Sequence, residues 1–187
     1  MHNYLNIYYF IDQFNRNEII NLDKNIALIY RNYSKDCDLD TIKDIHHLCK
    51  KVKRKFFISN NLKIAKQLGL NGVYIPSFNK LRNFKNLNAN KNFIVLGSAH
   101  NKIELLNKFN QGCSFIFLAP TFLVKKKQNF LGVIKFNLLT LGFKKNFIAL
   151  GGINQNNLKK INLLNCSGFG GISWIKKTAQ ENLGRFK

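Results

Sequence analysis

Acidic residues are scarce in this sequence of 187 residues: 9 Asp and Glu stand against 30 Lys and Arg, for a formal net charge of +21. Proline is rarer still, with two residues. No run of about eighteen apolar residues occurs, so we expect no membrane-spanning helix. The first residues lack the basic and apolar regions of a secretory signal peptide, which predicts a cytoplasmic protein.

The four cysteines are scattered and include no C-x-x-C pair. This spacing supports neither a zinc site nor a redox pair. We expect reduced thiols that serve mostly as small core residues. The four are Cys37, Cys49, Cys113 and Cys166.

The positive charge has two interpretations. A nucleic-acid-binding protein would carry it, and Lys50–Lys55 and Lys125–Lys127 are basic patches of the kind that contact phosphates. The excess is mostly lysine, however, and it is spread along a chain rich in asparagine, as a coding bias toward these residues would produce. We favour the coding bias over a nucleic-acid partner; a positive field still favours phosphorylated small ligands.

Residues 146–175 contain the most informative pattern of the chain. Two short apolar runs each end in a glycine pair, at Gly151-Gly152 and Gly170-Gly171, with about one helix of residues between them. Glycines at strand ends let backbone N–H groups approach a ligand, and Asn154 stands where a helix N-cap is expected. Two such units near the end of a chain match the phosphate site of a (β/α)₈ barrel. The alternative is two ordinary strand-to-helix turns.

Apolar runs alternate with amphipathic stretches along the rest of the chain. This alternation predicts parallel strands connected by helices. The expected strands are 8–12, 25–33, 55–60, 71–76, 92–100 (the last of these residues forming its exit loop), 114–120, 146–150 and 167–175. The expected helices are 40–52, 61–68, 79–87, 102–109, 131–141 and 176–183, with a polar helix-like run after Asn154.

Eight strand signals predict an α/β fold, a small single-domain (β/α)₈ (TIM) barrel over residues 1–187. An open doubly wound sheet is less well supported, because no G-x-G-x-x-G follows the first strand.

Several short segments, in the expected order and spacing, resemble the thiamine phosphate synthase/TenI family. Ile58–Asn61, Ile64-Ala65 and Leu70–Ile75 resemble the family's "NDxxxxAxxxxADG" segment, and Leu96–His100 resembles "xGxSxH". Leu118–Pro120 with its basic loop, Ala149–Ile153 and Gly168–Ser173 resemble "GPxxPTxTK", "xxGGI" and "GxAVxS". The similarity runs from about Ile26 to Ile175.

The resemblance implies a (β/α)₈ barrel and a role in thiamine biosynthesis. The synthases are transferases that join a pyrimidine diphosphate to a thiazole phosphate and expel pyrophosphate with Mg²⁺. The TenI branch aromatises a thiazole phosphate tautomer without metal, using a histidine just after strand six, where this sequence has Pro120.

The residues that would hold metal and diphosphate are replaced. The two family aspartates that bind Mg²⁺ fall on Asn61 and Asn79, so the negative charges that a hard cation prefers are missing. The diphosphate-binding glutamine and lysine fall on Ile29 and Tyr33. The threonines of the loop after strand six fall near Val124 and Lys126. We therefore expect no metal ligands here, and Mg²⁺ as a cofactor only if synthase activity persists.

The remaining family positions are retained. They imply catalytic roles for Ser98, His100 and Lys127. They imply binding of the substrate and its phosphate by Arg31, Asn60, Gly151, Gly152, Ile172 and Ser173.

Each retained residue also has a structural interpretation. Arg31 is equally suited to pair with Asp12 or Asp36, and Ser98 and His100 are equally suited to cap the helix that begins near Asn101. Lys125–Lys127 either neutralise a diphosphate without metal or form a solvated loop.

The sequence predicts a protein of thiamine biosynthesis that binds thiazole phosphate or thiamine phosphate, with standard Mg²⁺-dependent coupling doubtful. The alternatives are a non-catalytic phosphate-binding or regulatory barrel and, less favoured, a nucleic-acid-binding protein. The prediction includes no membrane partner and leaves a homodimer open.

Overall fold

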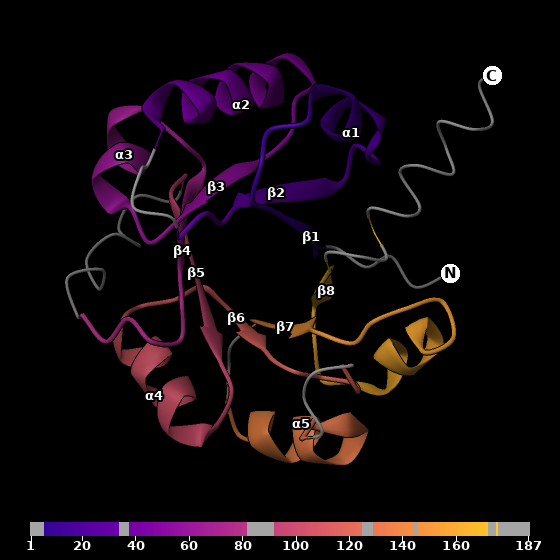
Figure 1. Cartoon of the computed structure of the whole chain (residues 1–187). Helices are drawn as coiled ribbons and strands as arrows, with labels where there is room; N and C mark the ends of the chain where they lie inside the picture. The colour runs from indigo at the N-terminus through magenta and orange to yellow at the C-terminus, as the bar shows by residue number, and fades with distance from the viewer. Residues whose placement is uncertain are drawn as a thin grey trace.

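Eight parallel strands form a closed barrel in the computed structural model of the chain, which describes residues 6–33, 38–81, 92–124, 129–143, 146–171 and 175. The strands follow one another around the ring in chain order, and β1 pairs with both β2 and β8. Figure 1 shows the helices surrounding this ring. The strands are β1 (Asn6–Ile11), β2 (Ile26–Tyr30), β3 (Phe56–Ser59), β4 (Gly72–Ile75), β5 (Ile94–Ala99), β6 (Phe115–Leu118), β7 (Asn146–Leu150) and β8 (Gly168–Gly171).

The predicted (β/α)₈ barrel is therefore confirmed, and the open sheet is excluded because β1 and β8 close the ring. The prediction that residues 1–187 form a single domain is not tested by the barrel alone. None of the helices in the described ranges is long and apolar enough to cross a bilayer.

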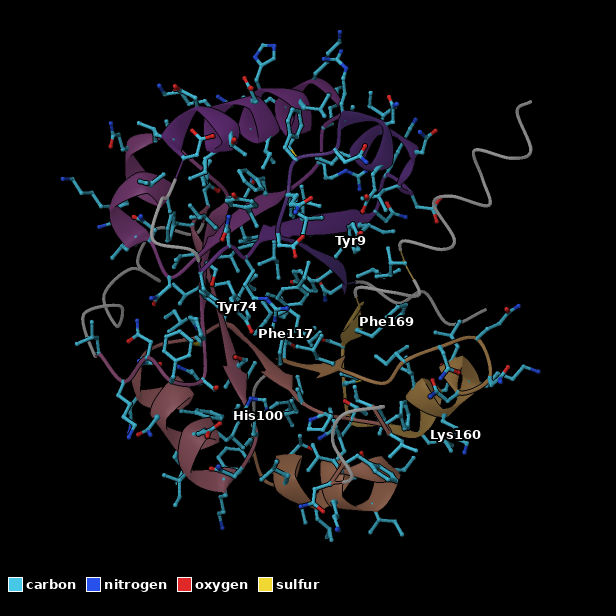
Figure 2. All side chains as sticks on the ribbon, viewed as in Figure 1. Tyr9, Tyr74, His100, Phe117, Lys160 and Phe169 are labelled. Atoms are coloured by element: carbon cyan, nitrogen blue, oxygen red, sulfur yellow. The ribbon has the colours of Figure 1, made fainter. Side chains whose placement is uncertain are left out.

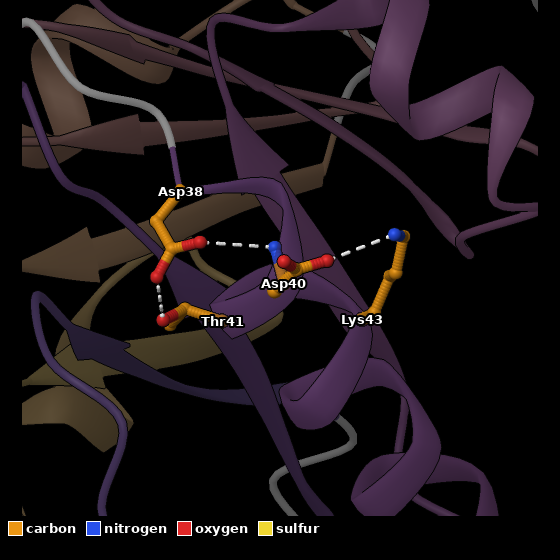
Figure 3. Close-up of polar contacts among 4 residues, drawn as sticks. All are labelled: Asp38, Asp40, Thr41 and Lys43. Atoms are coloured by element: carbon orange, nitrogen blue, oxygen red, sulfur yellow. Dashed lines mark hydrogen bonds and ion pairs between the residues drawn. The ribbon is translucent and has the colours of Figure 1, made fainter.

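The helices have local signals for where they begin. An asparagine or aspartate side chain accepts a backbone N–H at the start of α1, α2, α3 and α4, as an N-cap does. Figure 3 shows the cap of α2, where Asp38 accepts from the N–H of Asp40 and the hydroxyl of Thr41. The helices are α1 (Arg16–Asn21), α2 (Leu39–Lys51), α3 (Leu62–Gln67), α4 (Lys102–Asn110), α5 (Gly132–Thr140) and the 3₁₀ helix η2 (Leu158–Leu163).

Two features differ from the expected elements. Helix α1 was not predicted, although Asn15 and Glu18 have the spacing of an N-cap and a third helical residue. The helix expected at 79–87 is absent over Asn79–Leu81, and the rest of it lies outside the described residues. The last expected helix, 176–183, also lies outside them.

The barrel interior is filled mainly by aromatic side chains. Phe117 packs edge-on against Tyr8, Phe10 and Tyr74, with ring centroids 5.0–5.7 Å apart. Figure 2 shows Tyr74 and Phe117 within the ring of strands. A second, larger apolar cluster lies between the strands and the surrounding helices. The interior is therefore a packed core, and ligands must bind at its ends.

Candidate functional site

The carboxyl ends of the strands bring most of the predicted site residues to one end of the barrel. Arg31 follows β2, Asn60 follows β3, Ser98 lies near the end of β5, and Gly151 follows β7. Parallel strands that close into a barrel present all their carboxyl ends on one face, which is where barrel enzymes place their active sites. Lys127, Ile172 and Ser173 lie outside the described residues, so their predicted roles are not tested.

A polar cluster lies just inside this mouth around Tyr74. The Tyr74 side chain is buried, and this burial raises its pKa to about 12, while a hydrogen bond from Ser98 and the charge of Arg31 act in the opposite direction. The guanidinium of Arg31 also lies over the ring of Phe10, with Cζ 5.0 Å from the ring centroid. Among the described residues Arg31 makes no ion pair with Asp12, and Asp36 lies outside them.

His100 is oriented by contacts at both ends of the residue. Its backbone N–H donates to Oε2 of Glu104 at 2.8 Å, and its Nδ1 contacts the carbonyl oxygen of Ala119. Because a carbonyl can only accept, Nδ1 carries the proton and Nε2 is left as an acceptor in the neutral ring. Asn101, not Ser98 or His100, caps α4 with its side chain. The exposed imidazole of His100 therefore presents a basic nitrogen at the mouth.

Asn60 and Asn79 are hydrogen-bonded to each other. Asn60 has a left-handed backbone, with φ of +58°, which asparagine tolerates better than most residues. Its Oδ1 accepts from Nδ2 of Asn79 at 2.6 Å, and Oδ1 of Asn79 in turn accepts the N–H of Leu81. The Nδ2 of Asn60 donates to no other described residue.

The residues at the predicted magnesium positions do not fit that cation. Oδ1 of Asn61 accepts the N–H of Ile64 and caps α3, and both ends of the Asn79 amide are engaged as described. Neither residue supplies a carboxylate, and Mg²⁺ sites in proteins rely on carboxylate oxygens. Within the described ranges no group of three His, Cys, Asp or Glu side chains is placed to hold a metal ion.

A cavity of about 490 Å³ lies beside these asparagines, at the ends of β2, β3 and β4. Tyr33 and Phe78 form an edge-on aromatic pair with centroids 5.7 Å apart, and both rings are more than half exposed. No charged side chain lines the described part of this cavity. Its lining residues are Asn32, Tyr33, Ser59, Asn60, Asn61 and Phe78.

The segment after β4 is held in place by a buried lysine. Nζ of Lys108, on α4, donates to the backbone carbonyls of Pro76 and Asn79 and to Oε1 of Gln111, at 2.6–2.8 Å. Nε2 of Gln111 donates to the carbonyls of Asn79 and Leu81. Lys108 is 0% exposed, and burial lowers its pKa to about 8. This contact fixes the backbone that carries Asn79 and Phe78.

The glycine pair after β7 packs against the segment that follows β6. Gly152 has φ of +73°, and a Cβ there would lie 2.4 Å from the carbonyl oxygen of Phe122. The N–H of Phe122 donates to the carbonyl of Gly151 at 3.0 Å. Close approach of two backbones therefore requires glycine at 152, as the structural interpretation of this pair expects.

The turn after β7 also presents backbone donors. The N–H groups of Gly151, Gly152 and Ile153 donate to no other described residue. Asn154 does not cap an α-helix: its Oδ1 accepts from the N–H groups of Asn156 and Asn157, and the helix that follows is the 3₁₀ helix η2. The expected helix N-terminus is therefore replaced by three consecutive amides at the strand end.

Two residues that contribute to the site, Tyr74 and Lys108, were not predicted from the sequence. In the sequence, Tyr74 looks like any aromatic residue of a buried strand, and Lys108 is one of many lysines in a highly basic chain. The signal for Lys108 was its place between Leu105 and Phe109 on the apolar side of an amphipathic helix.

Together, these features define a closed parallel α/β barrel whose candidate site lies at the carboxyl ends of its strands. A family model described as thiamine monophosphate synthase matches residues 22–175. The chain therefore belongs to the thiamine monophosphate synthase family, which confirms the resemblance drawn from its motifs.

Curated relatives are thiamine-phosphate synthases. That of Flavobacterium johnsoniae is 30% identical over 158 residues, which cover 79% of this chain and 72% of that protein. One from Prochlorococcus marinus is 30% identical over 122 residues, which cover 64% of this chain and 35% of that protein. The chain spans less than half the length of the Prochlorococcus relatives that it matches, between 35% and 44%.

Solved structures share the fold. The thiamine phosphate pyrophosphorylase of Pyrococcus furiosus superposes with a TM-score of 0.72 at 16% identity, covering 97% of this chain and 95% of that one. The thiamine phosphate pyrophosphorylase of Bacteroides thetaiotaomicron gives a TM-score of 0.59 at 14% identity, covering 95% and 96%. At these identities the likeness concerns the barrel itself.

Proposed function

We propose that this protein binds thiazole phosphate or thiamine phosphate at the mouth of the barrel, as a thiamine phosphate synthase/TenI-type protein that works without Mg²⁺. The observation that carries the proposal is the row of amides at Gly151, Gly152 and Ile153, which have no described acceptor. Three adjacent N–H groups at a strand end suit a phosphate group. Family membership supports a phosphate ligand from thiamine biosynthesis.

The residues at the family's metal positions favour a reaction in which no metal ion neutralises a departing diphosphate. Asn61 and Asn79 replace the carboxylates and are hydrogen-bonded within the protein. The neighbouring cavity is lined by amides and by the rings of Tyr33 and Phe78, which cannot neutralise a diphosphate. Standard Mg²⁺-dependent coupling to the pyrimidine diphosphate is therefore disfavoured, since the described lining offers the departing diphosphate neither a carboxylate-bound cation nor a basic side chain.

A proton transfer of the tautomerase type is the chemistry that the described residues favour. Although Pro120 stands where the TenI branch has its histidine, the His100 imidazole reaches across from β5 to the carbonyl of Ala119, next to Pro120. With Nδ1 bonded to that carbonyl, Nε2 is the ring nitrogen left to take a proton from a bound thiazole tautomer and return it at the neighbouring atom. A non-catalytic binding barrel is the second candidate, favoured by the same loss of carboxylates.

A thermal-shift screen tests this proposal. Thiazole phosphate, thiamine phosphate and the pyrimidine diphosphate are added separately, each with and without Mg²⁺, because a ligand stabilises the folded protein according to its affinity. We expect stabilisation by thiazole phosphate or thiamine phosphate that Mg²⁺ does not change. A pyrimidine diphosphate shift that depends on Mg²⁺ would instead identify a working synthase.

Turnover separates the two candidates that remain. His100→Gln should abolish isomerisation of the thiazole phosphate tautomer while leaving the thermal shift intact. A wild-type protein that binds without isomerising the tautomer would be the non-catalytic barrel. Absence of any shift would contradict the proposal, and steep loss of DNA binding between low and physiological salt would support the basic-surface alternative.

A further inference from the structure

A second cavity, of about 510 Å³, lies at the opposite end of the barrel from the candidate site. Every described residue that lines it stands at the amino-terminal end of a strand or in the segment that leads into one. It is therefore separated from the mouth by the aromatic interior of the barrel. The described lining consists of Asn6, Ile7, Tyr8, Lys24, Asn25, Ile26, Ala27, Lys53, Lys55, Ile94 and Phe115.

A buried arginine joins the two segments that form the rim of this cavity. Arg54 is 5% exposed, and its Nη1 donates to the backbone carbonyls of Asp23 and Ile26, the first at 2.8 Å. Its Nη2 donates to the carbonyls of Leu22 and Ile19, at 2.9 and 3.3 Å. The segment leading into β2 is thus tied to the segment leading into β3, and the side chains that both carry are held around one opening.

The rim is basic. Lys24 comes from the first segment, and Lys53 and Lys55 flank Arg54 in the second, so three exposed lysines line a single cavity. No carboxylate is among the described lining residues. Asp23 is the neighbouring acid, and its charge acts on the Arg54 guanidinium behind the rim. The local balance is therefore positive, and a negatively charged ligand would be attracted.

The inner wall is apolar, with one polar group. Ala27 leaves space next to Ile94 and Phe115, which are partly exposed at the starts of β5 and β6. The side chain of Tyr8 also lines the cavity and is 3% exposed. Its hydroxyl makes no hydrogen bond to another described residue. A polar group of a ligand in the cavity can hydrogen-bond to this hydroxyl.

We propose that this cavity is a second ligand site, for a small aromatic molecule that carries a phosphate or a similar anionic group. The anion binds among Lys24, Lys53 and Lys55, and the ring lies against Phe115 and Ile94. The site is independent of the proposed function, since it shares no residue with the mouth.

Phenyl phosphate is the probe, with inorganic phosphate for comparison. Binding to the full chain is followed by titration calorimetry and by amide chemical shifts. We expect phenyl phosphate to shift the amides of residues 24–27 and 53–55, with smaller effects at residues 98–100 and 151–153. Inorganic phosphate should bind more weakly, because it cannot use the apolar wall.

Matched charge variants localise the binding. Replacing Lys24, Lys53 and Lys55 with glutamine should weaken phenyl phosphate binding by about tenfold. The control replaces three exposed lysines from other parts of the surface, Lys66, Lys135 and Lys160, and removes the same charge; Figure 2 shows Lys160 on the outside of the barrel. The control should bind as the wild type does.

A cavity-filling variant tests the apolar wall separately. Ala27→Leu keeps every charge but fills the space beside Phe115, so it should weaken phenyl phosphate more than inorganic phosphate. Circular dichroism establishes that the variants are folded. Equal loss in both lysine triples would show general charge attraction, and shifts confined to the mouth would place the ligand there; either result would overturn the proposal.

Discussion

Lys108 is a fully buried lysine whose three described acceptors are all uncharged. Burial lowers its pKa from 10.5 to about 8, while the charges of Cys113 and Glu104 oppose the shift. Between these two pH values the unfolded chain still holds the proton and the folded protein has released it. The free energy of unfolding therefore gains from this group as pH rises from about 8 to 10.5.

A comparison of wild type with Lys108→Met isolates this effect, since all other groups titrate in both proteins. We expect the difference in unfolding free energy to be constant below pH 8 and then to move in favour of the wild type by about 1 to 3 kcal/mol by pH 10. Urea unfolding at pH 7, 8, 9 and 10 measures it. If the difference in unfolding free energy does not change with pH, Lys108 does not have the lowered pKa expected from its burial. Lys108→Gln serves as a second variant if methionine prevents folding.

Gly152 is the residue whose replacement should be most revealing at the mouth. Gly152→Ala combines a left-handed backbone with a Cβ placed 2.4 Å from the carbonyl oxygen of Phe122. Gly69→Ala is the matched control, because φ there is +63° and nothing lies within 4 Å of the added atom. The control should lose about 1 kcal/mol from backbone strain, and Gly152→Ala at least about 2 kcal/mol more. Equal losses in thermal or urea unfolding would contradict the close backbone approach.

Sequence predicted which residues reach the mouth better than it predicted what they touch. Arg31, Asn60, Ser98 and His100 lie at the same end of the barrel because each stands at or after the carboxyl end of a strand, and parallel strands share one direction. The partner of each depends on which strands are neighbours and on how side chains pack, as with the bond between Asn60 and Asn79. The role of Tyr74 was not predicted for the same reason, because it depends on Ser98, which lies on the adjacent strand.

At the level of single elements, α2 depends on its first turn. Asp38 accepts from the N–H of Asp40 and from the hydroxyl of Thr41, and these hydrogen bonds lower the pKa of its carboxyl group. A lowered pKa means that the stabilisation is full at neutral pH and is lost as pH falls through the folded-state value.

Asp38→Ala should therefore lower the melting temperature at pH 7, and the difference from wild type should shrink as the pH falls below 3.8, the ordinary pKa of the carboxyl. Asp44→Ala, in the exposed middle of the same helix, is the control and should have a smaller effect. A loss that persists unchanged at the lowest pH would show that the carboxylate is not the group responsible.

Hydrophobic periodicity predicted most of the helices and strands, but not the residues at which they begin and end. All eight strands were predicted, and β2 proved shorter than expected because Arg31 and Asn32 already belong to the mouth. The six-residue helix α1 is too short to show a helical repeat, and its cap was the only local signal. The polar run after Asn154 became a 3₁₀ helix because the asparagine side chains there satisfy the backbone donors themselves.

The whole molecule carries 30 basic and 9 acidic side chains, so most positive charges have no opposite partner in the sequence. Mutual repulsion of like charges destabilises the compact state, and salt screens it. We expect the melting temperature to rise when potassium chloride is increased from 20 to 300 mM. A melting temperature that is unchanged or lower at high salt would show that repulsion between the positive charges does not destabilise the folded protein.

The pairing of β1 with β8 has a consequence for synthesis on the ribosome. One edge of β1 has no partner until β8, the last strand, has been translated, and Gly168 lies 157 positions after Ile11. At about 5 to 20 residues per second, that edge stays open for roughly 10 to 30 seconds in every nascent chain. An open, apolar strand edge recruits other strands. Expression at a slower translation rate should therefore yield more aggregate, and chaperones that cover nascent β1 should improve recovery.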